Sequence, residues 1–228
     1  MNITNLASIF LALTLCSGAF GQSAVDPAVE ATAALVQSEM EKAANVTAKN
    51  RAKDLLQDAQ SQVMGNAQGD VTIVAFTDYQ CPYCKAAEPR ILQLLKDDRK
   101  VRFVVKDFPI LGPASVVAAK AALAAAKQGK HHEFHVALMA FKGQLQDEII
   151  FATAKSVGLD VERLKKDILS PEIADQLLAN MNLARALKVS VVPGYFVNTR
   201  VLSGVSSRTQ TSKIDFAAEI ATARANRE

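Results

Sequence analysis

Two cysteines separated by two residues, in Cys81-Pro82-Tyr83-Cys84, constrain this 228-residue chain more than any other feature. The β-rich run 71–77 precedes them and predicts a buried strand, whereas residues 86–95 after them have helical spacing. We therefore expect Cys81 at the N-cap region of a helix that Pro82 opens. A disulfide across so short a loop restrains the unfolded chain little. The pair thus indicates redox exchange or metal binding rather than a structural crosslink.

The position of the pair assigns a different role to each thiol. A cysteine at a helix N-terminus faces unpaired backbone N–H groups and the positive end of the helix dipole, and both favour the thiolate. We therefore predict that Cys81 is the nucleophile. Cys84, one turn inside the helix, is expected to be more buried and to act as the resolving thiol that attacks a mixed disulfide at Cys81.

Metal binding is the main alternative class of function. His131 and His135 are four residues apart on an expected helix and could join the two thiolates around zinc or copper. The interval from Cys84 to His131 greatly exceeds that of a compact zinc finger, and a proline between the cysteines suits a helix start better. We therefore expect no metal site, and expect His131, His132 and His135 to be partly exposed helix residues. A redox-inactive scaffold is a third alternative.

The first residues have the pattern of a secretory signal peptide. Residues 3–15 form an uncharged apolar run, and small residues follow it up to Gly21. We expect residues 1–21 to be removed, Cys16 with them, although the segment lacks the usual Lys or Arg before its apolar run. The mature protein is then periplasmic or otherwise exported, with association with the cell envelope as a further option.

Residues 22–66 are expected to form an N-terminal helical extension. Asp26-Pro27 provides an N-cap acceptor followed by proline, and Gly65-Asn66 is the expected end. Thr47 and Asn50 interrupt the apolar stripe, which predicts one broken helix or two. The extension either folds back on the rest of the chain or projects as a stalk that forms a homo-oligomer, since an amphipathic stripe serves both.

Residues 67–228 are expected to form an α/β domain with a helical insertion at about 113–187. The insertion is rich in Ala and Leu, and its helices are expected to be separated near Gln128-Gly129, Gly143, Gly158 and Ser170-Pro171. Further strands are expected at 101–105, 195–197 and 201–202, and a closing amphipathic helix is expected at 213–227.

The absence of Trp, the 6% of aromatic residues and the net charge of +3 without a basic cluster argue against nucleic-acid binding.

Four sequence motifs together carry a family resemblance. They are, in chain order, Phe76-Thr77-Asp78-Tyr79-Gln80 leading into the two cysteines, Lys106-Asp107-Phe108-Pro109, Gln128-Gly129-Lys130 with Glu133-Phe134-His135, and Val192-Pro193-Gly194-Tyr195-Phe196-Val197-Asn198. From about Val71 to its end the chain resembles the DsbA family of exported thioredoxin-fold proteins. The resemblance implies a thioredoxin fold with an inserted helical domain, and a cis-proline at Pro193 that faces the dithiol. Backbone groups beside this proline, including those of Val192, are then expected to pair with an extended substrate.

The chain departs from the family pattern at two positions. Ala75 stands where related proteins often place an acid that accepts the proton of the resolving thiol, so another group or water must do so here. Lys106, at the end of a strand, either approaches the site or is a solvated charge. Tyr83 stands where strongly oxidising relatives carry histidine, and a neutral side chain there should give a less oxidising potential.

The resemblance implies an enzyme that exchanges disulfides with exported, cysteine-containing proteins and needs no organic cofactor. A membrane redox partner would reset the dithiol. The chain resembles, within this family, the Com1-like proteins and the copper-sensitivity suppressor C group, which include proteins with such N-terminal extensions. We therefore favour an isomerase or reductase if the chain is oligomeric, with a monomeric DsbA-like disulfide oxidase as the alternative.

Overall fold

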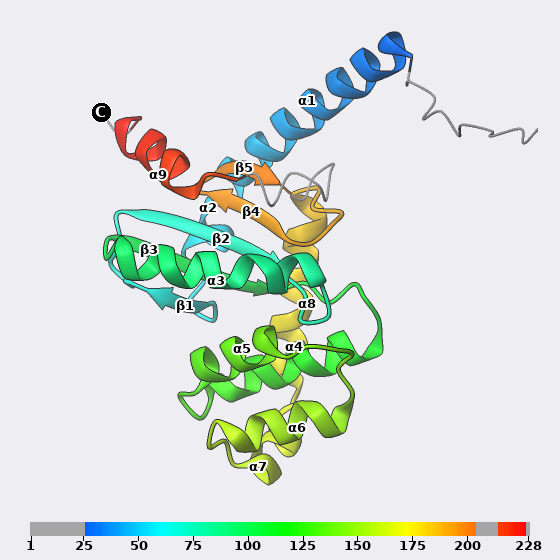
Figure 1. Ribbon diagram of the computed structural model, residues 1–228, viewed down its shortest axis with the longest axis vertical. Helices are drawn as coiled ribbons and strands as arrows, with labels where there is room; N and C mark the ends of the chain where they lie inside the picture. The colour runs from blue at the N-terminus through cyan, green and yellow to red at the C-terminus, as the bar shows by residue number, and fades with distance from the viewer. Residues whose placement is uncertain (1–25, 204–213, 227–228) are drawn as a thin grey trace, which may run out of the picture.

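A five-stranded mixed sheet lies at the centre of the fold (Figure 1). The computed structural model describes residues 26–203 and 214–226, so the expected signal peptide and Cys16 lie outside the described residues. The strands are β1 (Gln62–Gly65), β2 (Val71–Thr77), β3 (Val101–Asp107), β4 (Gly194–Val197) and β5 (Arg200–Ser203). Their order is β1-β3-β2-β4-β5, with β2 and β3 parallel and the other pairs antiparallel. The strands expected from the sequence are present, whereas β1 was not expected.

Alternating side chains of β2 face two different apolar layers. Ile73 and Ala75 pack in one buried cluster with α3 (Pro82–Asp97) and α9 (Phe216–Ala225). Val74 and Phe76 pack in the other cluster, with the inserted helices and the N-terminal helices. This alternation follows from the period of two in a strand, and both faces are covered, so almost every residue of β2 is buried.

Five helices are inserted between β3 and β4. They are α4 (Pro113–Ala126), α5 (His131–Ala140), α6 (Asp147–Ser156), α7 (Val161–Asp167) and α8 (Pro171–Ala186). Each expected break separates two of them, and the side chains of Asp160 and Ser170 cap the starts of α7 and α8. The fold class predicted from the sequence, a thioredoxin fold with inserted helices and an N-terminal helical extension, is therefore confirmed.

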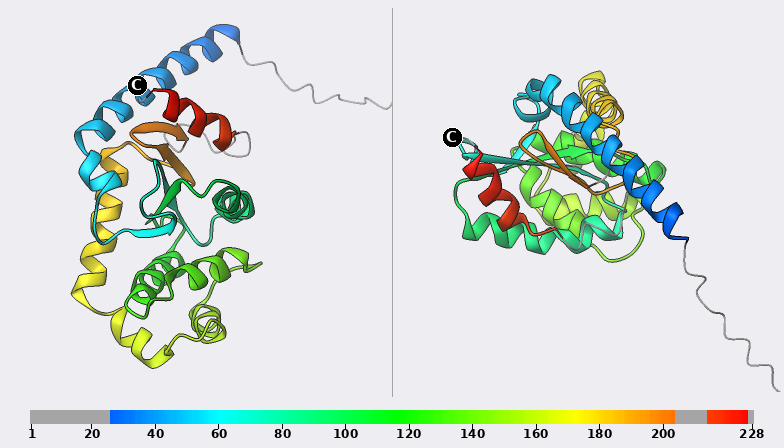
Figure 2. Two further views of the ribbon diagram at one scale, coloured as in Figure 1. Left: turned by 90° about the vertical axis from the view of Figure 1, so that its left-hand side faces the viewer. Right: turned by 90° about the horizontal axis from the view of Figure 1, so that it is seen from above.

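The N-terminal extension is broken where the sequence indicated, but it is shorter than expected. It consists of α1 (Pro27–Asn50), capped by Asp26, and α2 (Ala52–Leu56), with the break at Arg51. The helix was expected to continue to Gly65, but Gln62–Gly65 instead form β1, which pairs with β3 at the edge of the sheet. In α1, the residues that are buried are Ala44 and Ala48, near its C-terminal end. The rest of α1 extends away from the body of the molecule (Figures 1 and 2). None of the described helices is long and apolar enough to cross a membrane.

Candidate active site

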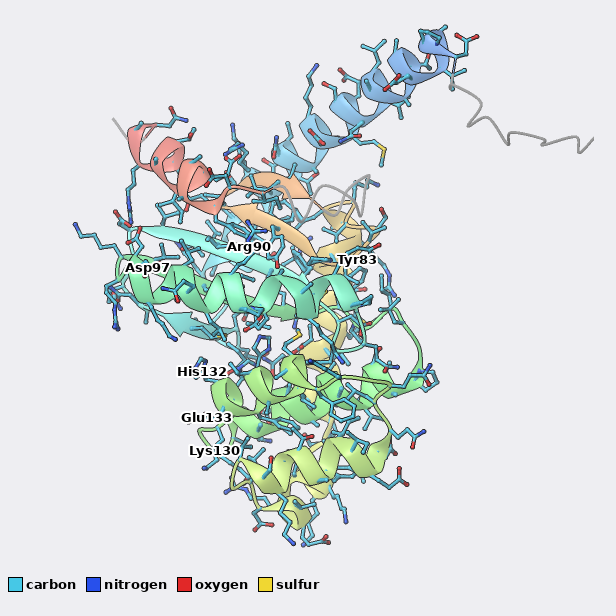
Figure 3. All side chains as sticks on the ribbon, in the orientation of Figure 1. Tyr83, Arg90, Asp97, Lys130, His132 and Glu133 are labelled. Atoms are coloured by element: carbon cyan, nitrogen blue, oxygen red, sulfur yellow. The ribbon has the colours of Figure 1, made fainter. Side chains whose placement is uncertain are left out.

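The end of β2 and the start of α3 hold the two cysteines. Cys81 is the N-cap residue of α3, and its Sγ accepts a hydrogen bond from the backbone N–H of Cys84 at 3.3 Å. Pro82 is the first residue of the helix, as the sequence predicted. Both cysteine side chains are buried, whereas Tyr83 between them is 47% exposed. Figure 3 shows Tyr83 at the N-terminal end of α3, with Arg90 and Asp97 further along the same helix.

The loop before β4 contacts the first cysteine. The peptide bond between Val192 and Pro193 is cis, as the family resemblance implied. The Sγ of Cys81 donates a hydrogen bond to the backbone carbonyl of Val192 at 3.4 Å. This loop therefore lies directly beside the thiol, although it is distant in sequence.

The surroundings give the two thiols opposite acidities. The hydrogen bond from the Cys84 side chain, together with backbone N–H groups of Cys84 and Tyr83, lowers the pKa of Cys81 against the effect of burial. Burial raises the pKa of Cys84 well above its ordinary value, and the adjacent Cys81 raises it further. The arrangement therefore favours a thiolate at position 81 and a thiol at position 84.

The buried carboxylate of Asp78, a residue that the sequence placed in a family motif without a role of its own, organises the backbone around the cysteines. Asp78 Oδ2 accepts hydrogen bonds from the backbone N–H groups of Ile110 and Leu111 at 2.8 and 3.0 Å. Its Oδ1 accepts from the hydroxyl of Ser115 at 2.7 Å and from the N–H of Gln80 at 2.8 Å. The only sequence signal for this role is that Asp78 lies between a strand and the first cysteine, where a polar side chain often caps a turn.

The two histidines considered as metal ligands do not meet the cysteines. His131 and His135 were expected to be partly exposed, but both are buried, while His132 between them is exposed. The His135 ring lies in a polar cluster, with Nδ1 2.9 Å from the Tyr79 hydroxyl and Nε2 3.4 Å from Glu88 Oε1. His131 stacks on His135. Within residues 26–203 and 214–226, no group of three or more His, Cys, Asp or Glu side chains could hold a metal ion.

Neither position 106 nor position 75 places a charged group at the dithiol. Lys106 is buried rather than solvated, and its Nζ forms an ion pair with Asp58 Oδ2 at 2.7 Å. Ala75 lies in the apolar cluster beneath α3, with Ala87 and Ile91. The position where relatives often carry an acid is therefore part of an apolar layer in this chain.

These features define a class of protein. A parallel strand leads into a helix whose N-cap is the first of two cysteines, and a cis-proline loop contacts that cysteine, which is the arrangement of a thioredoxin-fold thiol:disulfide oxidoreductase. The model of the family "DSBA-like thioredoxin domain" matches residues 72–213. The chain belongs to this family, whose enzymes use a redox-active disulfide and no external cofactor.

Three individual proteins show what the chain is similar to. A thioredoxin-like oxidoreductase from Silicibacter pomeroyi is 38% identical, with a TM-score of 0.66 over 73% of this chain and 97% of that chain. The probable disulfide bond formation protein D of Bacillus cereus is 27% identical over 163 residues, which cover 66% of this chain and 76% of the relative. The Na⁺/H⁺ antiporter NhaA 3 of Salinispora tropica is 34% identical over 140 residues, which cover 60% of this chain. The match spans only 22% of the antiporter's length.

Proposed function

We propose that this chain is an exported thiol:disulfide oxidoreductase that exchanges disulfides with cysteine-containing exported proteins. The observation that carries the proposal is the position of Cys81, whose Sγ accepts the N–H of Cys84 at the start of α3. Backbone hydrogen bonds to a sulfur stabilise its thiolate relative to the thiol and so lower the thiol pKa. The thiolate is the species that attacks disulfides.

In the proposed reaction, the Cys81 thiolate attacks one sulfur of a substrate disulfide. A bond forms between that sulfur and Sγ of Cys81, the substrate disulfide breaks, and the second substrate sulfur leaves as a thiolate. In reduction, Cys84 loses its proton and attacks Cys81, which closes the protein disulfide and releases the first substrate thiol. In isomerisation, the released substrate thiolate attacks another substrate disulfide, and a substrate thiolate finally displaces Cys81 unchanged. Oxidation of a substrate dithiol is the reverse of reduction.

The other site residues position the reacting groups. Pro82 starts the helix that presents Cys81, and Pro193 places the Val192 carbonyl beside Sγ. The backbone at Val192 is the proposed contact for an extended substrate strand. Tyr83 is exposed and, unlike histidine, has no ring that can become a cation beside the Cys81 thiolate, so we propose a potential less oxidising than that of relatives with histidine there.

Export and a redox partner belong to the same proposal. Residues 1–21 supply the proposed signal peptide, and export would place the dithiol in a compartment where disulfides form. A catalytic dithiol must be reset after each net oxidation or reduction. We assign this task to a membrane redox partner, in keeping with the family.

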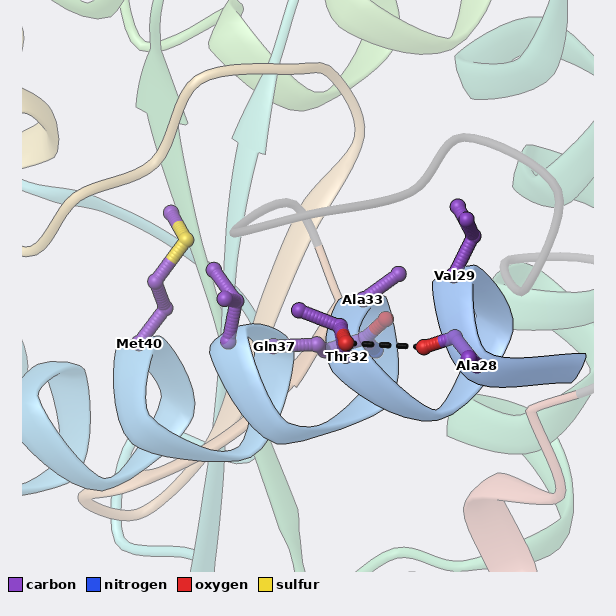
Figure 4. A pocket seen from close by; sticks show the side chains of 7 residues that line it. Ala28, Val29, Thr32, Ala33, Gln37 and Met40 are labelled. Carbon is purple, nitrogen blue, oxygen red and sulfur yellow. Dashed lines mark hydrogen bonds between the residues drawn. The ribbon is translucent and has the colours of Figure 1, made fainter. Parts of the chain in front are cut away.

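The shape of α1 favours a projecting stalk. Its large apolar side chains are exposed, including Leu35 at 68% and Val36 at 56%. A shallow groove runs along the helix, lined by residues of α1 that include Val29, Val36 and Met40 (Figure 4). Exposed apolar rows of this kind normally mark interaction surfaces. We therefore propose a homo-oligomer formed through α1, which acts as an isomerase or reductase, whereas a monomer would act as an oxidase.

The chemistry is tested with a substrate that carries scrambled disulfides and with single cysteine variants. Cys81→Ser should abolish both isomerisation and reduction. Cys84→Ser should instead accumulate a mixed disulfide between Cys81 and the substrate, visible as a band that disappears after reduction. If Cys81→Ser retains wild-type turnover, the proposed function is wrong.

The stalk is tested by charge substitution of its apolar face. Leu35→Glu combined with Val36→Glu should reduce the solution mass to that of one chain and lower isomerase activity. Leu169→Glu is the matched control, because Leu169 is 79% exposed on the inserted helical region. If the wild type and the double variant are both monomers that oxidise reduced substrates equally well, the chain is a monomeric oxidase.

A further inference from the structure

A buried carboxylate lies at the end of β3. Asp107 is 1% exposed, and within residues 26–203 and 214–226 neither of its carboxylate oxygens has a hydrogen-bond partner at an ordinary distance and angle. Burying a carboxylate without hydrogen bonds costs free energy whenever the group is charged. The fold therefore keeps Asp107 at a cost in stability, which points to a use in the chemistry.

The strand register places Asp107 close to the position that lacks the family's acid. Thr77 and Asp107 are register partners in the parallel ladder of β2 and β3. Two residues earlier on β2 is Ala75, which packs in the apolar cluster with α3. Because side chains alternate between the two faces of a strand, Thr77 and its partner Asp107 face the same side of the sheet as Ala75. The neighbouring strand thus supplies an acid beneath α3 where β2 has none.

Thr77 connects this acid to the resolving thiol. Burial raises the pKa of Cys84 well above its ordinary value, and a hydrogen bond from the buried Thr77 side chain opposes the rise. A hydroxyl can accept one proton while it donates its own, so it can carry a proton between two groups that do not touch. Thr77 is therefore placed to pass a proton from Cys84 on α3 to Asp107 on β3.

The groups around Asp107 let it change its protonation state near neutral pH. Burial raises its pKa from 3.8 to about 7, whereas His135 and the nearby Tyr79 hydroxyl lower it. The Tyr79 hydroxyl also lies 2.9 Å from His135 Nδ1, so Asp107 borders a polar cluster. The other titratable groups of this cluster are Asp78, Glu88 and His131. A general base is most effective when its pKa is close to the working pH, and Asp107 meets this condition.

We propose that Asp107 accepts the proton of Cys84, through the Thr77 hydroxyl, when Cys84 resolves the mixed disulfide. The S–H bond of Cys84 breaks, its proton passes to the Thr77 oxygen, and the Thr77 proton moves to Asp107. The Cys84 sulfur attacks Sγ of Cys81, the protein disulfide forms, and the substrate sulfur leaves with the electron pair of its bond to Cys81. The dithiol is oxidised and the substrate disulfide is reduced. The inference rests on the proposed function and names its proton acceptor.

The test follows the reduction of a nitrobenzoate disulfide by the reduced full-length protein, which releases one coloured thiolate in each of two steps. Attack by Cys81 releases the first thiolate, and attack by Cys84 on the mixed disulfide releases the second. In the wild type, the rate of the second step should rise with pH and level off above about pH 7, where Asp107 is already ionised. In Asp107→Asn this step should be about a hundredfold slower at neutral pH. It should also keep rising with pH, because it then depends only on the thiolate fraction of Cys84.

The first step and two further variants are the controls. Asp107→Asn should change the first step less than about twofold, because Cys81 attacks before Cys84 loses its proton. Thr77→Val removes the hydroxyl and should slow the second step as Asp107→Asn does. Asp97→Asn is the matched control, because Asp97 is exposed at the far end of α3 (Figure 3), and it should change neither step.

Unfolding at several pH values checks the fold of the variant and the charge of the acid. The folded pKa of Asp107 lies above its unfolded value, so the wild type loses stability as the pH rises from 3.8 to about 7. Asp107→Asn should therefore gain stability relative to wild type over this range. A variant that is less stable by the same amount at every pH would show a structural role and overturn the proposal.

Three kinetic outcomes would also overturn the proposal at different levels. If Asp107→Asn keeps the wild-type pH profile of the second step, or if Glu88→Gln removes the levelling instead, Asp107 is not the acceptor. If Thr77→Val leaves the second step unchanged, the path through the hydroxyl is wrong. If the wild type releases no coloured thiolate in either step, the proposed function itself is wrong.

Discussion

The Sγ of Cys81 lies 3.4 Å from the backbone carbonyl of Val192, although 111 positions separate the two residues in the chain. Between the two residues the chain runs through α3, β3 and the five inserted helices α4 to α8 before it returns to the site. The helices can therefore be inserted without disturbing the site, because the paired strands β2, β3 and β4 fix both sides of it.

The first prediction concerns the unequal acidity of the two thiols. In the reduced protein, iodoacetamide should modify Cys81 at pH values below the ordinary thiol pKa and leave Cys84 unmodified, because burial keeps Cys84 protonated. Replacing Cys84 with Ala removes its hydrogen bond to Cys81, so the midpoint of Cys81 alkylation should move to higher pH. Peptide mass spectrometry over a pH series measures both. Equal modification of the two thiols in the reduced wild type would contradict the assignment.

The sequence was sufficient to predict the local structure at the dithiol. The change from strand to helical spacing placed Cys81 at the N-cap and Pro82 at the first helical position, and both expectations are confirmed. Such features depend on neighbours along the chain, which periodicity and capping rules describe.

Features that depend on distant contacts could not be predicted in the same way. The strand β1 follows residues with helical spacing and exists because it pairs with β3. The burial of His131 depends on the packing of α5 against its surroundings, and the role of Asp78 depends on a loop about thirty residues away. Tertiary packing overrides local preference at each of these positions.

The second prediction concerns Asp78, which accepts four hydrogen bonds. Each carboxylate oxygen of Asp78 accepts two hydrogen bonds. In Asp78→Asn, an NH₂ group replaces one of these oxygens, so a donor faces donors and buried hydrogen bonds are lost. We therefore expect a loss of about 3 kcal/mol in the free energy of unfolding. The charge of Asp78 also raises the pKa of Cys81, so the variant should lower it. Denaturant unfolding and Cys81 alkylation measure the two effects. Asp175→Asn, on the exposed side of α8, should change neither.

The third prediction concerns the buried Lys106 and its partner Asp58. Asp58→Asn leaves the oxygen that accepts from Gln60 but removes the charge that faces Lys106, so a buried ammonium loses its counterion. We expect a loss of about 3 kcal/mol in unfolding free energy. Lys106→Met should cost about 1 kcal/mol or less, because Asp58 is 29% exposed and can be hydrated.

The double variant of this ion pair is decisive. Lys106→Met combined with Asp58→Asn removes both charges, so its stability should return close to that of Lys106→Met alone. Urea unfolding of the four proteins at neutral pH gives the coupling energy. Additive losses would show that Asp58 stabilises the fold by some means other than its charge.

The last prediction concerns His131, whose buried ring stacks on His135. Burial, with His135 and His132 nearby, lowers the pKa of His131 from 6.5 to about 3. Between these values the unfolded chain binds a proton that the folded chain does not, so the unfolding free energy falls as the pH falls through this window. The slope for one such group is about 1.4 kcal/mol per pH unit.

His131→Gln should remove this contribution, so the variant gains stability relative to wild type as the pH is lowered from 7 to 4. His132→Gln is the matched control, because His132 is exposed on the same turn of α5 and is the smallest of the three causes of the lowered His131 pKa, so its replacement should change the difference much less. Urea titrations at several pH values measure the difference, and a His131→Gln profile parallel to wild type would show that the ring is not held neutral in the folded protein.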